Sequence, residues 1–232
     1  PFSMANVTID LGGQWLAKLD PHDLGHQSKW FQEDFTETSL NAVNVQLPGS
    51  IQHQGLGNDP STETPWVTRV APMENYPSWY SADLYAKYRT KEGFRFPYWL
   101  QPKKHYVGLV WFQRSIEISE DATLQRQVLL LERTHWKTSV WIDGETLGSQ
   151  DSLVAPHRYD CTKWLTPGTH RLTIAVDNRM IHDVGINAHS VTDHTQTAWN
   201  GIIGRIELIR MSNIQIDDIQ VNRRAVFVEE GK

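Results

Sequence analysis

Cysteine is almost absent from this 232-residue sequence, in which Cys161 is the only one. A single cysteine excludes an internal disulfide and any zinc site built from several cysteines. Long apolar runs are also missing, because stretches such as Val128 to Leu131 are far shorter than the roughly 20 residues that a membrane-spanning helix needs. The sequence therefore gives no reason to expect a membrane partner.

Positive charge is scarce as well. The chain has 22 Lys and Arg against 27 Asp and Glu, a formal net charge of −5, and its basic residues form no cluster. Nucleic acids bind groups of Lys and Arg that neutralise phosphates, so no nucleic-acid partner is expected.

The first residues, Pro1 to Ala5, lack the basic and apolar regions of a signal peptide. Either no signal peptide exists or one was removed before residue 1. Localisation stays open on this ground, with a periplasmic or secreted bacterial protein favoured over a cytoplasmic one.

Several catalytic motifs are missing. The sequence has no glycine-rich phosphate-binding loop, no His-Glu-x-x-His zinc motif and no Gly-x-Ser-x-Gly nucleophile motif. Retaining glycosidases need two carboxylates roughly 5 Å apart, and no such pair stands out among the acidic residues. The densest polar cluster, from His182 to His194, fits a solvated loop or ligand contact better than a metal site. We therefore expect no catalytic residue, no cofactor and no metal.

What the sequence does have is period-two alternation of apolar and polar residues, with turn residues between the segments. It predicts strands over 14–19, 43–47, 110–118, 127–132, 172–176 and 204–209. Asp143-Gly144 predicts a tight hairpin turn within 139–148, because both residues tolerate the positive φ angles that such a turn requires. Many short strands with little helix indicate an all-β fold, a β-sandwich or jelly roll.

Tryptophan is abundant, with ten residues. Aromatic faces stack on sugar rings, so this content points faintly towards carbohydrate. The core of the sandwich is nevertheless the favoured place for any one of them.

Two long connections interrupt the strands. The stretch from Gln52 to Lys104 contains six prolines and many aromatic residues, which favour a packed, ordered excursion. Val184 to Trp199 is a second, polar connection. After a linker-like stretch at 210–213, residues 214–221 and 225–228 have the pattern of two strands. Because two strands cannot bury their own apolar face, we expect them to begin a second domain.

Three segments carry a resemblance to a known family: 140–148 (Val-Trp-Ile-Asp-Gly-Glu-Thr-Leu-Gly), 159–165 (Tyr-Asp-Cys-Thr-Lys-Trp-Leu) and 168–179, which ends in Asp-Asn-Arg. Together they resemble the sugar-binding domain of glycoside hydrolase family 2, which includes β-galactosidases and β-glucuronidases. Trp111-Phe112-Gln113-Arg114, Trp199 to Leu208 and Leu47 to Ser50 resemble further motifs of that domain. The likeness spans roughly Gly13 to Arg210.

This resemblance implies a non-catalytic, galactose-binding-domain-like jelly roll. Family members continue into an immunoglobulin-like domain and a catalytic (β/α)8 barrel, so residues 1–211 are expected to form the sugar-binding domain. Residues 212–232 would be the linker and first strands of an incomplete immunoglobulin-like domain. A barrel alone needs about 250 residues, and the sequence lacks the Asn-Glu dipeptide that carries the family's acid/base. The chain alone is therefore not expected to hydrolyse glycosides.

The resemblance also implies a substrate contact. Loops of this domain in the family reach the mouth of the barrel and contact the terminal sugar through an Asp and an Asn. By position, the candidates are Asp183, Asn187, Asp193 and His194, with Asp183 favoured over Asp193. Each could equally well hold only its own loop in place.

The implied partners are an oligosaccharide substrate, in the context of the full enzyme, and the catalytic barrel. Two other functions stay open from the sequence. One is a free-standing carbohydrate-binding module of the same jelly-roll type, and the other is a purely structural or interaction sandwich.

Overall fold

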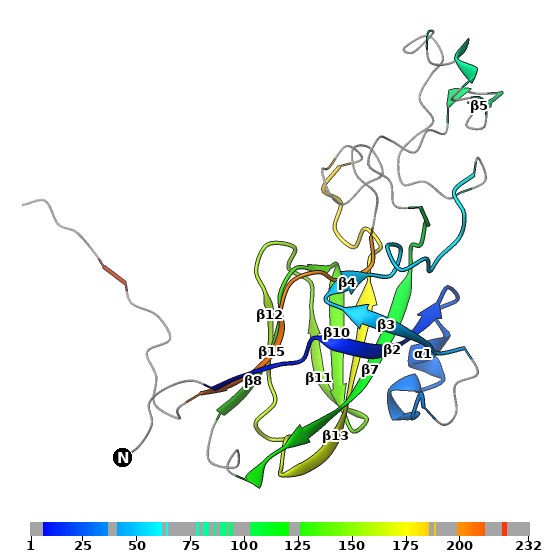
Figure 1. The fold of residues 1–232 in the computed structure, drawn as a ribbon. Coiled ribbons are helices and arrows are strands. Elements are labelled where there is room, and N and C mark those ends of the chain that lie inside the picture. The colour runs from blue at the N-terminus through cyan, green and yellow to red at the C-terminus, as the bar shows by residue number, and fades with distance from the viewer. Residues whose placement is uncertain are drawn as a thin grey trace, which may run out of the picture.

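The fold is a sandwich of two antiparallel sheets (Figure 1). The computed structural model describes residues 7–36, 41–61, 64, 78, 81–83, 86, 89–91, 93–94, 103–120, 126–185, 188, 199–211 and 220–221. One sheet has the order β1 (Val7–Asp10), β15 (Ile206–Met211), β8 (Arg126–Leu131) and β12 (His157–Asp160). The other has the order β11 (Glu145–Gln150), β10 (Lys137–Ile142), β13 (Gly168–Asp177), β7 (Leu109–Ile118), β2 (Gly13–Asp20) and β3 (Val43–Leu47).

Shorter elements complete the described fold. A small sheet of β4 (Gly49–Ser50), β14 (Gly201–Ile202) and β9 (Thr134–His135) lies at one end of the sandwich, and β5 (Arg89–Thr90) pairs with β6 (Gly93–Phe94). The named helices are the single turns α1 (Leu24–Gln27) and η1 (Trp30–Gln32). The predicted all-β sandwich with little helix is confirmed.

Alternation along the strands builds the core between the two sheets. In β13, Leu172, Ile174 and Val176 face the other sheet and are buried. Leu129 and Tyr159 of the four-stranded sheet belong to the same buried cluster. The strand predicted at 127–132 is present as β8, in which residues 127–131 are all buried, whereas Glu132 lies after the strand and is half-buried. Successive residues of a strand point to opposite faces of the sheet, so the two-residue repeat determines which side chains form the core.

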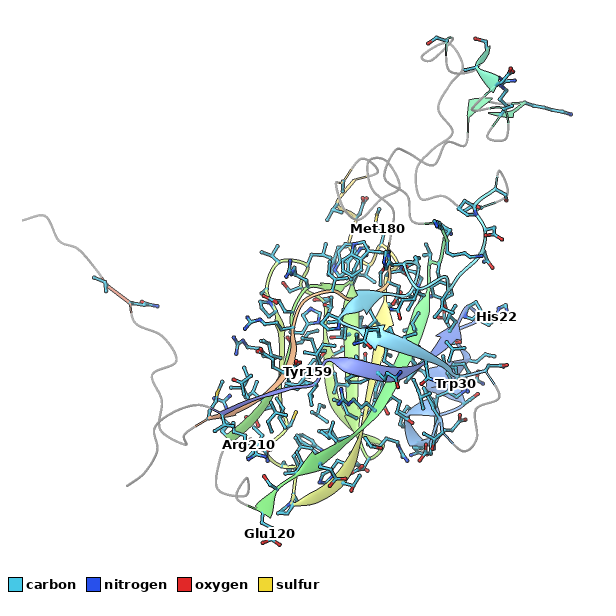
Figure 2. All side chains as sticks on the ribbon, viewed as in Figure 1. His22, Trp30, Glu120, Tyr159, Met180 and Arg210 are labelled. Carbon is cyan, nitrogen blue, oxygen red and sulfur yellow. The ribbon has the colours of Figure 1, made fainter. Side chains whose placement is uncertain are left out.

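The outer face of the six-stranded sheet carries a second apolar cluster. Trp111, Trp141 and Ala175 form it, and the segment 21–36, which contains α1 and η1, packs over it. Figure 2 shows His22 and Trp30 in this segment beside the sheet. Gly25 is required for the close packing, since a Cβ there would lie 2.4 Å from the ring of Trp111.

The predicted hairpin is present between β10 and β11. Asp143 and Gly144 have φ angles of 51° and 85°, the left-handed values that a two-residue turn needs. The Asp143 carboxylate adds a tertiary role, because it accepts a hydrogen bond from the backbone N–H of Arg171 at 2.7 Å and lies 2.6 Å from Nδ1 of His170. The turn is thereby tied to the start of β13.

Two boundaries differ from the prediction. Arg210 and Met211, predicted to be linker, are the last residues of β15 and pair with Gln127 and Arg126 of β8. The strands also begin before the first predicted one, because β1 pairs with β15.

Other predictions fall wholly or mostly outside the described residues. These are the packing of most of 52–104, the strand at 225–228 and nearly all of the strand at 214–221. Val221 is described, lies outside any strand and is exposed. Within the described residues, no helix has the length and apolar character needed to cross a membrane.

Candidate functional site

The candidate site is the end of the sandwich at which β13 stops. The chain leaves β13 through Asn178 and Arg179, enters the polar connection that carries the predicted sugar contacts, and returns at Trp199 to form β14. The small sheet of β4, β14 and β9 lies at the same end (Figure 1). Both ends of the 181–199 connection are therefore attached to the sandwich here.

Three buried amide side chains, Gln52, Asn178 and Asn200, fix these attachments; we call them the amide cluster. Asn178 accepts a hydrogen bond from the backbone N–H of Gly108 at 2.8 Å. Its Nδ2 donates to the carbonyl oxygens of Tyr106 at 2.8 Å and Trp199 at 3.2 Å. One side chain thus joins the departing end of the connection to its returning end.

Asn200 reinforces the same junction. Its Nδ2 donates to the carbonyl oxygens of Gly108 at 2.9 Å and Val176 at 3.1 Å. The backbone N–H of Asn200 donates to Oε1 of Gln52 at 3.0 Å. Because an unpaired backbone group buried away from water is costly, these side chains make the tight crossing of four chain segments possible.

Gly201 allows β14 to approach β4. It has a φ of 137°, and a Cβ on it would lie 2.4 Å from the carbonyl oxygen of Gly49. Only glycine combines this backbone conformation with that close approach. The backbone geometry therefore explains why the Trp-Asn-Gly-Ile motif has glycine at this position.

His135 of β9 lies beneath the returning end of the connection. Its side chain is buried, its Nδ1 lies 2.6 Å from the carbonyl oxygen of Trp199, and the two rings are 4.9 Å apart. A carbonyl only accepts, so Nδ1 carries the proton and Nε2 is left as an acceptor, which has no partner among the described residues. Burial lowers the pKa of His135 from its ordinary 6.5, which keeps the ring neutral at pH 7.

We expect this neutral histidine to make stability depend on pH. As the pH falls below about 6.5, the unfolded chain takes up a proton that folded His135 does not, so the free energy of unfolding falls. Between pH 7.0 and 5.5 the upper limit of this loss is about 1.2 kcal/mol. Burial also lowers the pKa of His157, which adds a loss of the same sign.

Urea unfolding at the two pH values measures the effect. His135→Gln should remove its own share of the loss, whereas His22→Gln, at an exposed histidine, should leave the loss unchanged. The same pH dependence in all three proteins would contradict the assignment.

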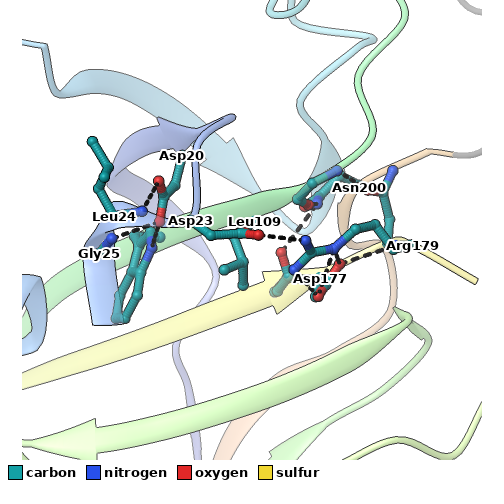
Figure 3. A network of polar contacts seen from close by, with 12 residues as sticks. Asp20, Asp23, Leu24, Gly25, Leu109, Asp177, Arg179 and Asn200 are labelled. Carbon is teal, nitrogen blue, oxygen red and sulfur yellow. Dashed lines mark hydrogen bonds and ion pairs between the residues drawn. The ribbon is translucent and has the colours of Figure 1, made fainter. Parts of the chain in front are cut away.

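A charged network borders the amide cluster (Figure 3). Arg179 donates from Nε and Nη2 to the carboxylate of Asp177 at 2.9 and 2.6 Å, and from Nη1 to Asp23 at 2.6 Å. These carboxylates raise the pKa of Arg179 further above its ordinary value, chiefly because Asp177 accepts hydrogen bonds from the guanidinium. Arg179 thus ties the end of β13 to the segment 21–36.

A buried carboxylate holds α1 nearby. Asp20 accepts from the backbone N–H groups of Leu24 and Gly25, both at 2.8 Å, and from Nε1 of Trp111 at 3.1 Å. Its charge is therefore satisfied inside the protein. This set of hydrogen bonds stabilises the short helix, which has no side-chain cap.

Of the predicted sugar contacts, Asp183 is the one that the structure describes. It is exposed, and its Oδ1 accepts a hydrogen bond from the backbone N–H of Gly185 at 3.0 Å. This bond holds its own loop, and the second carboxylate oxygen has no hydrogen-bond partner among the described residues. Asn187, Asp193 and His194 lie outside the described residues.

Neighbouring His182 anchors the start of the connection. Its Nε2 lies 3.1 Å from Oδ2 of Asp151, and its ring meets the buried ring of Trp136 edge-on at 5.7 Å. Asp183 therefore follows directly on a residue in contact with the sandwich. No group of three His, Cys, Asp or Glu side chains in the described part of the chain is placed to hold a metal ion.

The amide cluster and His135 were not predicted as functional residues, although Asn178 and Asn200 stand in quoted motifs. The hydrogen bonds described above are made to the backbone, so these side chains position chain segments. The signal that could have indicated this role is a polar residue next to glycine, or at the end of a strand whose other residues are apolar.

No family model matches the sequence. A putative β-glucuronidase of Formosa agariphila is 27% identical over 90 residues, which cover 36% of this chain and 9% of that protein. A β-glucuronidase of an uncultured Clostridium has a similar structure, with a TM-score of 0.59 and 18% identity, over 92% of this chain and 30% of that one.

Ruminococcus gnavus β-glucuronidase gives a TM-score of 0.56 and 11% identity over 89% of this chain and 29% of that one. The same enzyme in complex with D-glucuronic acid gives 0.57 and 11%. At these identities the likeness shows a shared fold. The chain spans about 30% of the length of these solved structures.

Proposed function

We propose that this chain is the non-catalytic sugar-binding domain of a family 2 glycoside hydrolase, and that the full enzyme hydrolyses O-glycosidic bonds of β-glucuronides. Residues 1–211 are the sandwich domain, and residues 212–232 begin an immunoglobulin-like domain. The catalytic carboxylates belong to a barrel elsewhere in the full enzyme. The fold shared with β-glucuronidases over about nine-tenths of the chain supports the proposal that the full protein is a glycoside hydrolase.

The observation that carries the role of the domain is the amide cluster. It clamps both ends of the 181–199 connection by buried hydrogen bonds. A loop that must place a carboxylate or amide against a sugar hydroxyl needs such fixed ends, because sub-ångström positioning contributes to transition-state binding. In the proposed enzyme, Asp183 is a substrate-binding residue, and Asn187, Asp193 and His194 are further candidates.

Substitution of Asp183 in the full-length enzyme tests this function. Asp183→Ala should lower kcat/KM for nitrophenyl β-glucuronide by roughly 5- to 150-fold, the equivalent of about 1–3 kcal/mol for the loss of a hydrogen bond between a carboxylate and a sugar hydroxyl. The melting temperature should change little, because Asp183 is exposed and holds only its own loop. Asp193→Ala is measured in parallel.

Glu145→Ala is the matched control. Glu145 is an exposed carboxylate next to the turn at the other end of β10. Its substitution should leave kcat/KM unchanged. Full activity of both aspartate variants at an unchanged melting temperature would make the connection purely structural. Failure of the full-length enzyme to cleave any β-glucuronide would reject the proposed substrate class.

A further inference from the structure

A hollow of about 410 Å³ lies on the outer face of the six-stranded sheet. Its floor is low because two small residues, Ser139 of β10 and Ala175 of β13, are cross-strand partners there. The segment 21–36 covers the neighbouring Trp111 and Trp141, and its His26, whose ring contacts both tryptophans, lines the hollow. The volume is within the range of pockets that bind small molecules.

The charges around the hollow balance. Asp177 and Asp23 are both paired with Arg179 (Figure 3). Arg179 donates to both oxygens of Asp177. Lys137, the cross-strand partner of Asp177, makes no ion pair among the described residues. The two carboxylates and the two cations thus leave no net charge, and a charged ligand of either sign would meet a like charge.

Four polar groups around the hollow keep free hydrogen-bonding capacity. The Lys137 ammonium, the Ser139 hydroxyl and the His26 ring make no hydrogen bond with the described part of the chain, and neither does Oδ1 of Asp23. The ammonium only donates, the carboxylate only accepts, and the hydroxyl does both. Between them lie the apolar side chains of Ala175 and Leu109.

This combination suits a ligand with several neighbouring hydroxyl groups and one apolar face. A hydroxyl accepts from the ammonium while it donates to the carboxylate, and the C–H face of a sugar ring can rest on the apolar floor. We infer that the hollow is a binding site for a neutral hexose residue, separate from the 181–199 connection. The inference does not depend on the proposed function, since it uses neither Asp183 nor a catalytic barrel.

Titration of the 232-residue chain, labelled with ¹⁵N, tests the site. The probes are methyl β-glucoside, methyl β-galactoside and methyl β-mannoside, with methyl β-glucuronide as a charged probe and glycerol as a small polyol. At least one neutral hexoside should shift the amide signals of Ser139, Ala175 and Asp177 in a saturable way. Glycerol should not do so, because it lacks the ring that spans the floor.

Two variants locate the binding. Ser139→Leu should fill the hollow and weaken hexoside binding at least tenfold, and Ser139 is half-exposed in a strand, so the fold should tolerate leucine. Lys137→Met should weaken it by about tenfold or more, the loss expected for one hydrogen bond to a charged group. Lys103→Met, at an exposed lysine without a contact among the described residues, is the matched control and should change nothing.

Several outcomes would overturn the inference. They are no shift at these amides with any hexoside, equal binding by Ser139→Leu and the unmodified chain, and tighter binding of the glucuronide than of all three neutral hexosides. Equal shifts with glycerol would also reject a sugar site. None of these results bears on the effect of Asp183→Ala in the full-length enzyme, so the two proposals fail separately.

Discussion

Alanine in place of Gly201 is expected to lower the free energy of unfolding by about 3–5 kcal/mol. The new methyl group would lie 2.4 Å from the Gly49 carbonyl oxygen and 3.2 Å from Cα of Ser50. Both are backbone atoms, and β14 pairs with β4 through these residues. The strands would have to separate, which would break hydrogen bonds next to the amide cluster. Urea unfolding followed by tryptophan fluorescence measures the change.

Gly168→Ala is the matched control for this substitution. Gly168 has a φ of 129°, close to the 137° of Gly201, but a Cβ there would meet nothing within 4 Å. Its cost should be the backbone strain alone, roughly 1–2 kcal/mol. The difference between the two variants isolates the close approach of β14 and β4. Equal costs would mean that this approach relaxes without loss.

The strands that could be predicted are those that have one face in the core between the sheets. In β2, β7 and β13, apolar residues at every second position point into the core between the sheets, and the residues between them lie on the outer face of the six-stranded sheet. The second face was expected to be polar, from residues such as Gln113 and Glu117. The sequence pattern could not show that segment 21–36 covers Trp111 and Trp141 there, since such cover depends on contacts distant in the sequence.

The strand boundaries that were missed have physical reasons too. β1 is an edge strand of four residues, all exposed or half-exposed, and its Val-Thr-Ile-Asp alternation is too short to stand out in the sequence. Arg210 has the composition of a linker, yet it is buried in β15, and its Nη2 donates to Oγ of Ser119 at 2.9 Å. A tertiary partner gives a hydrogen bond to a side chain that the local sequence would place in solvent.

The candidate site was predictable in part. One motif ends in Asp177-Asn178-Arg179, just before the connection, and another begins at Trp199-Asn200-Gly201, just after it. In the structure these two motifs lie together, joined by a hydrogen bond from Asn178 to Trp199. The amide cluster could not be read from spacing, because Asn200 and Gln52 meet across 148 positions. Asp183 keeps its predicted place in the connection, and its contact with a sugar stays a proposal.

Removal of the Asn178 side chain is the second change with a large expected effect. Asn178→Ala deletes one accepted and two donated hydrogen bonds. It leaves the buried N–H of Gly108 without its acceptor, and the carbonyls of Tyr106 and Trp199 lose a donor. At about 1 kcal/mol for each of the three lost bonds, plus about 1–3 kcal/mol for a buried group left unpaired, we expect a loss of about 4–6 kcal/mol in the free energy of unfolding.

Asn44→Ala is the control for this change, because Asn44 is exposed on edge strand β3 and should cost no more than about 0.5 kcal/mol. Hydrogen exchange separates a local effect from a global one. In Asn178→Ala the amides of Asn200 and Ile203, which donate to Gln52 and to the Arg133 carbonyl, should lose protection beyond the global change. The amides of β8, paired with β12 and β15 on the other sheet, should follow global stability alone. A cost below about 1 kcal/mol would mean that water satisfies the freed groups, and the amide cluster would then not be what holds the two ends of the connection together.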